Sequence, residues 1–133
     1  MEYYRDIYKS WKNDHLKFWA KQSEAVTWEK KPKKILDNSN SPFYKWFPDG
    51  TLNTSYNAID RHVLSGSGDQ DAIIYDSPVT NTKKRITYSQ LQYKVSQFAG
   101  ALTKLSVVKG DRVIIYMPMI PEALVAMLAC ARI

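Results

Sequence analysis

The sequence predicts an α/β fold, in which an N-terminal helix and a long wrapping loop precede a β-hairpin–α–β–α unit. Three observations predict it. Aromatic residues recur at helical spacing in the first 22 residues. Proline, glycine, asparagine and serine interrupt residues 25–56, which is typical of irregular chain. From residue 72 onward, short apolar runs alternate with helical periodicity, as in α/β proteins.

The segment Glu2–Gln22 is predicted to be one amphipathic helix with an aromatic stripe, because large side chains recur every three or four residues and lysines fall between them. The stripe consists of Tyr4, Ile7, Tyr8, Trp11, His15, Phe18 and Trp19. We interpret it as a surface that docks on its own protein; the alternative is a helix that binds a partner. His15 is interpreted as a packed imidazole and not as a ligand.

Residues Ala25–Tyr56 are expected to be an extended loop whose many aromatic side chains pin it to a surface. Phe47–Thr51 is predicted to be a turn, in which Pro48 presets one backbone dihedral and Gly50 accepts a positive φ.

A short helix is predicted over Asn57–Leu64, with Ser55 or Asn57 as its cap. Ser65–Gly68 ends it as a surface connection. This stretch lacks the lysine of a phosphate-binding loop, so we do not interpret it as a nucleotide site.

Strands are predicted at Ala72–Asp76 and Arg85–Tyr88, joined by the turn Ser77–Thr82 into a hairpin. Thr87 and Gln90 have the spacing of a capping box and open the next helix. Its apolar positions are Leu91, Val95, Phe98, Leu102 and Leu105.

Lys109–Asp111 is predicted to be a tight turn that leads into Arg112–Tyr116, a continuous apolar run typical of a strand covered on both faces. Pro121 is well placed to open the last helix, Glu122–Arg132. That helix has no polar face, so we expect it to be buried on nearly all sides. No strand follows it before Ile133, and we therefore expect the sequence to be truncated, with the missing part supplying the sheet and the cover.

Composition excludes several classes of protein. The 133 residues are 44% hydrophobic and 24% charged, which is ordinary for a globular domain. The single cysteine, Cys130, excludes an intrachain disulfide framework and a cysteine-rich zinc site. No apolar run reaches the roughly 20 residues of a membrane helix. The polar, acid-bearing N-terminus is unlike a signal or transit peptide, and we expect the cytoplasm or the mitochondrial matrix.

No catalytic, cofactor-binding or metal-binding residue is predicted. His15 and His62 lack metal-ligand spacing. Asp60 and His62 are two residues apart and point away from each other on a helix, so they do not form a dyad. Arg61 and His62 could meet a charged ligand, but local helix packing is favoured. Cys130 lies in the apolar helix and is interpreted as a small core residue.

The net charge of +6 comes largely from two clusters, Lys30–Lys34 and Lys83–Arg85. Basic patches beside aromatic residues can bind nucleic acid. Neither cluster lies on a periodic face that would follow phosphates, so a solvated loop and a charged turn are favoured.

Five strings, in this order and spacing, resemble the N-terminal part of the AMP-forming short-chain acyl-CoA synthetases, the acetyl- and propionyl-CoA synthetases. They are Lys45–Asn53, which contains Trp-Phe-x-x-Gly; Tyr56–His62, which contains Asn-x-x-Asp-Arg-His; Gly110–Val113; Ile115–Ala123, which contains Met-Pro-Met-Ile-Pro-Glu; and Met127–Ile133. Ser41–Phe43 and Tyr75–Thr80 look more like the propionyl-CoA synthetase branch.

The resemblance implies an adenylate-forming large domain: residues 1–60 would be the N-terminal acyl-CoA-synthetase-type segment, and 61–133 the incomplete start of the AMP-binding large domain. The parent enzyme would join a small carboxylate to CoA with ATP and Mg²⁺. The family's loop, nucleotide and lysine motifs are not carried over, because no string here matches them.

The fragment itself is expected to be inactive and architectural, with no cofactor of its own. Its expected partner is the remainder of the parent enzyme, with no nucleic acid and no membrane. We expect the isolated chain to pack poorly or to self-associate. The alternative is a stand-alone protein-interaction module that uses the aromatic helix.

Overall fold

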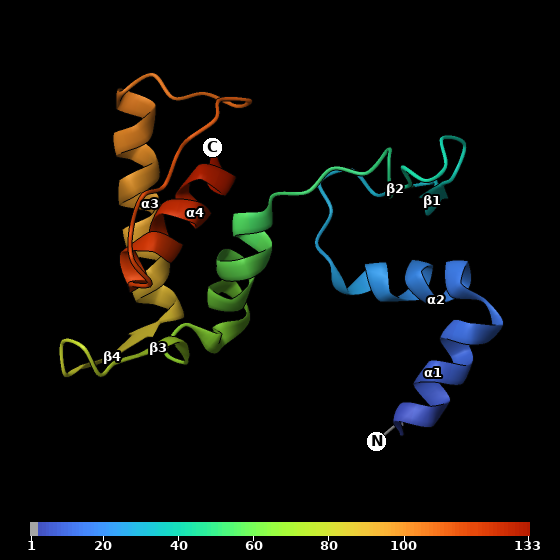
Figure 1. Cartoon of the computed structure of the whole chain (residues 1–133), viewed down its shortest axis with the longest axis horizontal. Coiled ribbons are helices and arrows are strands. Elements are labelled where there is room, and N and C mark those ends of the chain that lie inside the picture. Colours follow the sequence, from blue (N-terminus) through green and yellow to red (C-terminus); the bar gives the residue numbers. More distant parts are fainter. Residues whose placement is uncertain (1–2) are drawn as a thin grey trace. The chain divides into compact units, whose positions relative to one another are not determined.

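The computed structural model describes residues 3–133, which form two compact units divided between Leu52 and Asn53 (Figure 1). The first unit holds helices and a very short sheet, and the second holds a hairpin with helices. The chain is of mixed α/β class, as the sequence predicted.

The first unit begins with two helices, α1 (Tyr4–Asn13) and α2 (His15–Gln22), followed by the 3₁₀ turn η1 (Ser23–Ala25). The prediction of one continuous helix is wrong. The chain is extended at Asp14, with φ −154° and ψ 90°, and the Asp14 carboxylate accepts a hydrogen bond of 2.9 Å from the Lys17 backbone N–H. The extended backbone at Asp14 therefore ends α1. The Asp14 side chain then caps α2, because it accepts a hydrogen bond from a backbone N–H that has no carbonyl partner at the start of a helix.

The long loop of this unit contains two strands that the sequence did not predict. These are β1 (Leu36–Asp37) and β2 (Lys45–Trp46), paired antiparallel with Leu36 opposite Trp46. Each is two residues long and carries no alternating pattern long enough to recognise. The rest of the loop is irregular, as expected.

Ring contacts pin this loop, which confirms the expectation from its aromatic content. Trp19 of α2 meets Trp46 edge-on at 6.0 Å between ring centroids. Trp46 lies 6.1 Å from Phe47, and Phe47 lies 5.4 Å from Trp28. The chain of rings therefore connects α2 to both halves of the loop.

The turn at Phe47–Gly50 forms as predicted, with the Gly50 N–H donating to the Phe47 carbonyl at 3.1 Å. The predicted role of Gly50 is wrong, because the positive φ, 50°, belongs to Phe47. Glycine is needed at position 50 because there is no room for a side chain. A Cβ there would lie 2.7 Å from Cζ3 of Trp28, closer than real contacts allow.

The second unit opens with two π-type turns, η2 (Tyr56–Asp60) and η3 (Val63–Ser67). Neither Ser55 nor Asn57 caps them as predicted. The cap is Asn53, whose side-chain oxygen accepts a hydrogen bond of 2.9 Å from the Tyr56 N–H. Asparagine is among the best capping residues. Gly66 has φ 88° and interrupts the helix where the sequence predicted its end.

The predicted hairpin is confirmed and is longer than expected, with β3 (Asp71–Ser77) paired antiparallel to β4 (Thr82–Thr87). The Thr87–Gln90 capping box is also confirmed and opens α3 (Tyr88–Lys104). A turn at Lys109–Asp111 follows, and Pro121 stands at the start of α4 (Pro121–Arg132), both as predicted.

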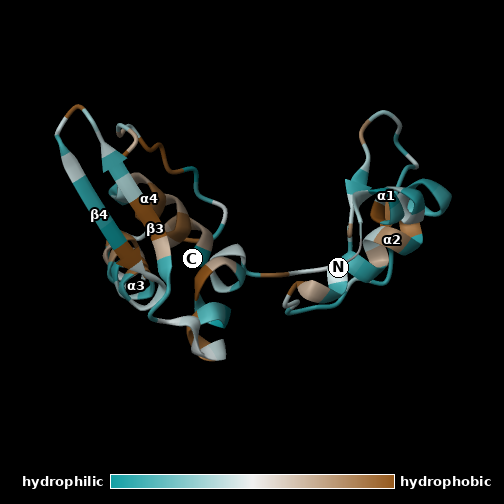
Figure 2. Cartoon of the chain, turned by 90° about the horizontal axis from the view of Figure 1, so that it is seen from below, coloured by the Kyte–Doolittle hydropathy of each residue, from teal (hydrophilic) through white to brown (hydrophobic). Residues whose placement is uncertain are grey.

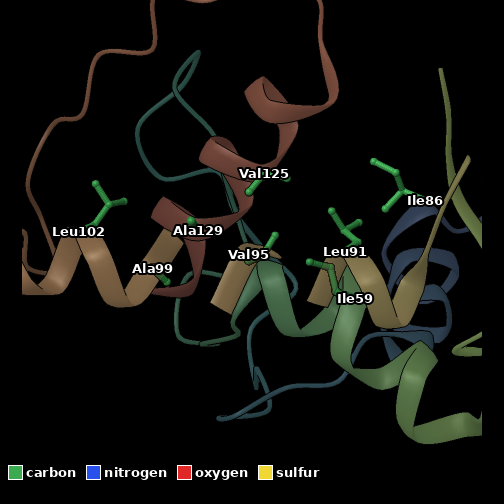
Figure 3. Packing of buried hydrophobic residues seen from close by; sticks show 8 residues of the cluster. All are labelled: Ile59, Ile86, Leu91, Val95, Ala99, Leu102, Val125 and Ala129. Carbon is green, nitrogen blue, oxygen red and sulfur yellow. The ribbon is translucent and has the colours of Figure 1, made fainter. Parts of the chain in front are cut away.

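The core of the second unit lies between α3 and α4. The largely brown ribbon of α4 in Figure 2 reflects the apolar composition of that helix. Side chains from η2, β4, α3 and α4 converge in one cluster (Figure 3). The cluster consists of Ile59, Ile86, Leu91, Val95, Ala99, Leu102, Val125 and Ala129. Two predicted members of the α3 face, Phe98 and Leu105, are exposed.

Two predictions for the end of the chain are wrong in this structure. Arg112–Tyr116 forms no strand, and Ile114 and Tyr116 are 92% and 99% exposed. A strand needs a neighbour for its backbone groups, and the hairpin does not pair with this segment. Helix α4 is buried on one face only, because Leu124 and Met127 are exposed.

Candidate functional site

Two of the strings singled out in the sequence meet in the second unit. Asp60, from the string at 56–62, and Arg132, from the string at 127–133, form an ion pair. One guanidinium nitrogen, Nη2 of Arg132, lies 2.9 Å from Oδ1 and 2.7 Å from Oδ2 of Asp60. The side chains are 13% and 27% exposed for Asp60 and Arg132 respectively. This is the least exposed ion pair among the described residues.

Gln92 of α3 joins the pair, because its Nε2 donates to Oδ1 of Asp60 at 2.7 Å. The Asp60 carboxylate therefore receives hydrogen bonds from two helices. Hydrogen bonds to an ionised group are stronger than neutral ones. The carboxylate ties η2 to both α3 and α4.

Asn53 completes the cluster from the other side of η2. Its Nδ2 donates to the backbone carbonyl of Arg132 at 3.2 Å, while its Oδ1 accepts from Tyr56. The same residue also accepts, through its backbone oxygen, from Nδ2 of Asn57 at 3.0 Å. We call Asn53, Asp60, Gln92 and Arg132 the polar cluster.

Neighbouring residues of the 56–62 string take local roles. His62 lies against the ring of Tyr88, with centroids 4.9 Å apart. Asp60 and His62 contact different partners: Asp60 binds Gln92 and Arg132, and His62 packs against Tyr88. Nη1 of Arg61 lies 3.5 Å from Oδ1 of Asn57, which fits the favoured interpretation of local packing.

Ser55 is fully buried, and its hydroxyl has no hydrogen-bond partner among the described residues. A buried hydroxyl without a partner costs about 1–3 kcal/mol. The sequence did not indicate that the Ser55 hydroxyl is buried, because a serine before a helix is ordinarily interpreted as its N-cap.

Both basic clusters are partly neutralised by carboxylates. Asp49 accepts hydrogen bonds from the backbone N–H of Lys33, at 3.0 Å for the shorter of two contacts, and from that of Lys34 at 3.1 Å. These hydrogen bonds lower the pKa of Asp49. Nζ of Lys34 lies 2.9 Å from Asp37. This contact, together with hydrogen bonds from Ser39, lowers the pKa of Asp37 to about 2.

The second cluster is paired across the hairpin. Lys83 contacts Asp76 at 2.9 Å, and Arg85 contacts Asp71 at 2.6 Å. Pairing of this kind is typical of a charged protein surface and leaves fewer cations for phosphates. It favours the interpretation of both clusters as solvated loop and turn.

The aromatic stripe lies on α1 and α2, where no described residue is buried. Tyr4 stacks on Tyr8, and Tyr8 packs beside Trp11, at 6.1 and 5.7 Å between centroids. The stripe is thus ordered by contacts along α1, and in α2 its Trp19 also packs against Trp46. Tyr8, Trp11 and Trp19 nevertheless remain 46%, 40% and 40% exposed. The prediction that His15 is packed is wrong, since His15 is exposed.

A groove of about 310 Å³ lies between β4, α3 and α4. Its apolar lining includes Ile86, Phe98 and Val125, and Lys94 and Glu122 also line it. Cys130 is half-buried against the core cluster, as the sequence predicted.

Beside Gly68 of the Ser65–Gly68 stretch the space is filled, because a Cβ there would lie 2.5 Å from Oγ of Ser89. Within residues 3–133 no three His, Cys, Asp or Glu side chains gather in a metal-binding group. None of the helices in that range is long and apolar enough to cross a membrane.

Comparison with protein families gives two matches. Residues 4–58 match the model of the acetyl-coenzyme A synthetase N-terminus, and residues 60–133 match that of the AMP-binding enzymes. The chain belongs to the AMP-binding enzyme family. The resemblance drawn from the five strings is thereby confirmed: the chain corresponds to the N-terminal part of a short-chain acyl-CoA synthetase.

Individual relatives of this chain agree with the family assignment. It is 58% identical over 120 residues to acyl-CoA synthetase short-chain family member 3, mitochondrial, of Bos taurus, which covers 90% of this chain and 18% of the relative. It is 54% identical over 128 residues to acetyl-coenzyme A synthetase of Streptomyces coelicolor, covering 96% of this chain and 20% of the relative.

Among solved structures, acetoacetyl-CoA synthetase from Streptomyces lividans matches with a TM-score of 0.78 and 31% identity, over 92% of this chain and 19% of that one. The chain thus spans about a fifth of the length of these relatives.

Proposed function

We propose that this chain is part of a longer ATP-dependent short-chain carboxylate–CoA ligase. The observation that carries the proposal is the pair of adjoining family matches over 4–58 and 60–133, together with identities above 50% to short-chain acyl-CoA synthetases. The proposed substrates are acetate or propionate, ATP and CoA.

The proposed reaction has two steps. The carboxylate attacks the α-phosphorus of ATP and releases pyrophosphate, which leaves an acyl-adenylate. The CoA thiol then attacks the acyl carbon and displaces AMP, giving the acyl-CoA thioester. No residue among 3–133 is assigned a part in either step, and the proposed role of this chain is architectural. By itself it would be inactive.

We propose that residues 1–60 are the N-terminal synthetase segment and that residues 61–133 are the start of the AMP-binding domain. The proposed location is the cytoplasm or the mitochondrial matrix, in line with the mitochondrial and bacterial relatives. The proposed partner is the remainder of the parent enzyme. It would cover the aromatic stripe and the exposed segment Arg112–Tyr116, for which a strand of that part would be the missing neighbour.

The test uses the protein translated from the complete coding frame beyond Ile133. Purified protein is incubated with ATP, Mg²⁺, CoA and either acetate or propionate, and AMP and acyl-CoA are measured. We expect both products in equal amounts, with one acid preferred, and no product from the chain 1–133. A frame that stops at Ile133, or a longer protein that forms no acyl-CoA with either acid, would contradict the proposal.

A second candidate is a stand-alone interaction module, favoured by the exposed stripe on α1. Trp11 packs against Tyr8 of its own helix, whereas Trp19 contacts Trp46 of the loop. Under this alternative, Trp11→Ala weakens partner binding and leaves the melting temperature unchanged. Under the synthetase proposal, the same change in the longer enzyme lowers its melting temperature.

A further inference from the structure

We propose that Asp14 is a joint that divides one amphipathic helix into two arms, α1 and α2, whose aromatic side chains serve different surfaces. The pattern of residues 4–22 fits a single helix, and the Asp14 side chain holds it in two pieces. The arm α2 is attached to the loop of its own unit, while α1 is directed at another surface. Only this use of α1 rests on the proposed function, in which the remainder of the enzyme covers the aromatic stripe.

The first step of the argument is that the aromatic pattern does not stop where α1 stops. Tyr8, Trp11 and His15 follow one another at three- and four-residue steps, and Trp19 comes four residues later. This spacing keeps side chains on one face of a continuous helix. The chain nevertheless changes direction between α1 and α2, as Figure 1 shows. The break is therefore imposed at Asp14 and is not part of the pattern.

The second step is the backbone hydrogen bonding around Asp14, where the two helices meet at one residue. The Asp14 N–H donates to the Ser10 carbonyl at 3.3 Å, in continuation of α1. The Asp14 carbonyl accepts from the Phe18 N–H at 2.9 Å, which starts α2. Between these two bonds lies the extended backbone of Asp14, with φ −154° and ψ 90°. A change at this one residue can therefore join the two helices or divide them.

The third step is that the Asp14 side chain supplies an acceptor that the divided helix loses. In a continuous helix the Lys17 N–H would donate to the carbonyl of Asn13, four residues earlier. Here it donates to Oδ1 of Asp14 at 2.9 Å. Aspartate and asparagine are favoured at such a capping position, and alanine is disfavoured there. Because alanine is also the best residue for a helix interior, Asp14→Ala should favour the continuous helix.

The fourth step is that the two arms make different contacts. In α2, the ring of Trp19 meets Trp46 of the loop at 6.0 Å between centroids. In α1, the rings of Tyr8 and Trp11 contact each other at 5.7 Å, and Trp11 is 40% exposed. The loop therefore holds α2, and the backbone at Asp14 decides where α1 points. Asp14 is thus a positioning residue for the aromatic side chains of α1.

The experiment measures the distance between positions 5 and 21 by double electron–electron resonance, in the longest form of the protein that the coding frame supplies. Spin labels on encoded keto amino acids replace Arg5 and Lys21, which are both exposed. These labels leave every cysteine unmodified. A continuous helix would place the two positions about 24 Å apart, at about 1.5 Å per residue. Two helices that change direction at Asp14 must give a shorter distance.

The deciding variants differ at position 14 alone. Asp14→Ala removes the capping oxygen and should lengthen the distance to about 24 Å. Asp14→Asn keeps a capping oxygen and should keep the shorter distance of the unsubstituted protein. The matched control is Asp6→Ala, which removes the same charge from the first turn of α1 at a residue that is not its cap. This control should leave the distance unchanged.

Amide hydrogen exchange at His15–Lys17 separates a joint from an ordinary cap. Loss of an ordinary cap frays the start of a helix, which speeds exchange there. Loss of the joint places the same N–H groups inside a continuous helix, so Asp14→Ala should slow their exchange roughly threefold or more. Mass spectrometry of peptides that cover residues 11–18 measures this rate.

The joint would be overturned by a distance of about 24 Å in the unsubstituted protein. An unchanged distance in Asp14→Ala, or faster exchange at His15–Lys17 in that variant, would overturn it too. So would a lengthened distance in Asp14→Asn, because the amide keeps the capping oxygen. Asp14 is exposed, so these variants do not alter a buried position. Neither measurement uses enzymatic activity, and an inactive longer protein would count against the proposed function and not against the joint.

Discussion

Asp60 and Arg132, 72 positions apart in the sequence, form an ion pair of 2.7 Å between η2 and the last turn of α4. Asp60 is 13% exposed and also accepts a hydrogen bond from Gln92 of α3. Three helical elements of the second unit therefore share one carboxylate. Two of the five strings that indicate the family at the level of sequence are in contact in the fold.

This pair should stabilise the second unit far more than the exposed pairs do. Removing one partner leaves a shielded charge without its counterion, so Asp60→Ala should lower the free energy of unfolding by about 2–4 kcal/mol. The control, Asp71→Ala on the hairpin, should cost at most about 1 kcal/mol because its partner Arg85 is exposed. Urea unfolding followed by circular dichroism measures both. Equal losses would contradict the prediction.

Gly50 should tolerate no side chain. Gly50→Ala places a Cβ 2.7 Å from Trp28 and should destabilise the first unit by about 1–3 kcal/mol. Gly100→Ala is the matched control, since a Cβ at this position of α3 meets no described atom within 4 Å. It should stabilise the chain by about 0.5–1 kcal/mol, because alanine favours a helix over glycine. Thermal melts should show a lower melting temperature for Gly50→Ala and a higher one for Gly100→Ala.

The buried hydroxyl of Ser55 should be dispensable. Ser55→Ala removes an oxygen that has no partner among the described residues, and we expect unfolding free energy to rise by up to about 1 kcal/mol. Ser55→Val, which adds volume to a fully buried position, should instead lower it. A clear loss of stability in Ser55→Ala would show that the hydroxyl has a partner in solution.

The loop of the first unit should loosen at strongly acidic pH. The pKa of Asp37 is lowered from 3.8 to about 2 by Lys34 and Ser39, and that of Asp49 is lowered by the backbone of Lys33 and Lys34. A lowered pKa gives stability that is fully present above about pH 4 and is lost as the pH falls toward 2. Tryptophan fluorescence should follow this loss through Trp46. Asp37→Asn should flatten the profile, and an unchanged profile would contradict the assignment.

The isolated chain should self-associate through Arg112–Tyr116. This segment is rich in β-forming residues, has no strand partner in the described fold, and exposes Ile114 almost completely. Ile114→Lys should reduce association severalfold in analytical ultracentrifugation. Val79→Lys changes an equally exposed residue of the hairpin turn and should have no effect. Similar reductions in both variants would point to net charge as the cause.

Several elements could be predicted from sequence because their signals are local. The capping box at Thr87–Gln90, the hairpin and the proline that opens α4 each depend on residues within a few positions of one another. The prediction of a single N-terminal helix was wrong for a related reason. The aromatic spacing continues through Asp14, and only the competition of its carboxylate for the Lys17 N–H reveals the break.

The polar cluster could not be predicted, since its contacts join residues 32–79 positions apart. The strings containing Asp60 and Arg132 indicated the family but not that the two side chains meet. Nor could the requirement for Gly50 be recognised, because it depends on where Trp28 lies.

The sequence by itself determined the family, the α/β class and the local starts and stops of α3, α4 and the hairpin, since these depend on short-range patterns. Only the tertiary structure decided which carboxylate pairs with Arg132, which glycine is confined and which apolar faces are covered. Those outcomes depend on contacts between segments that are far apart in the sequence, and short-range sequence patterns do not specify such contacts.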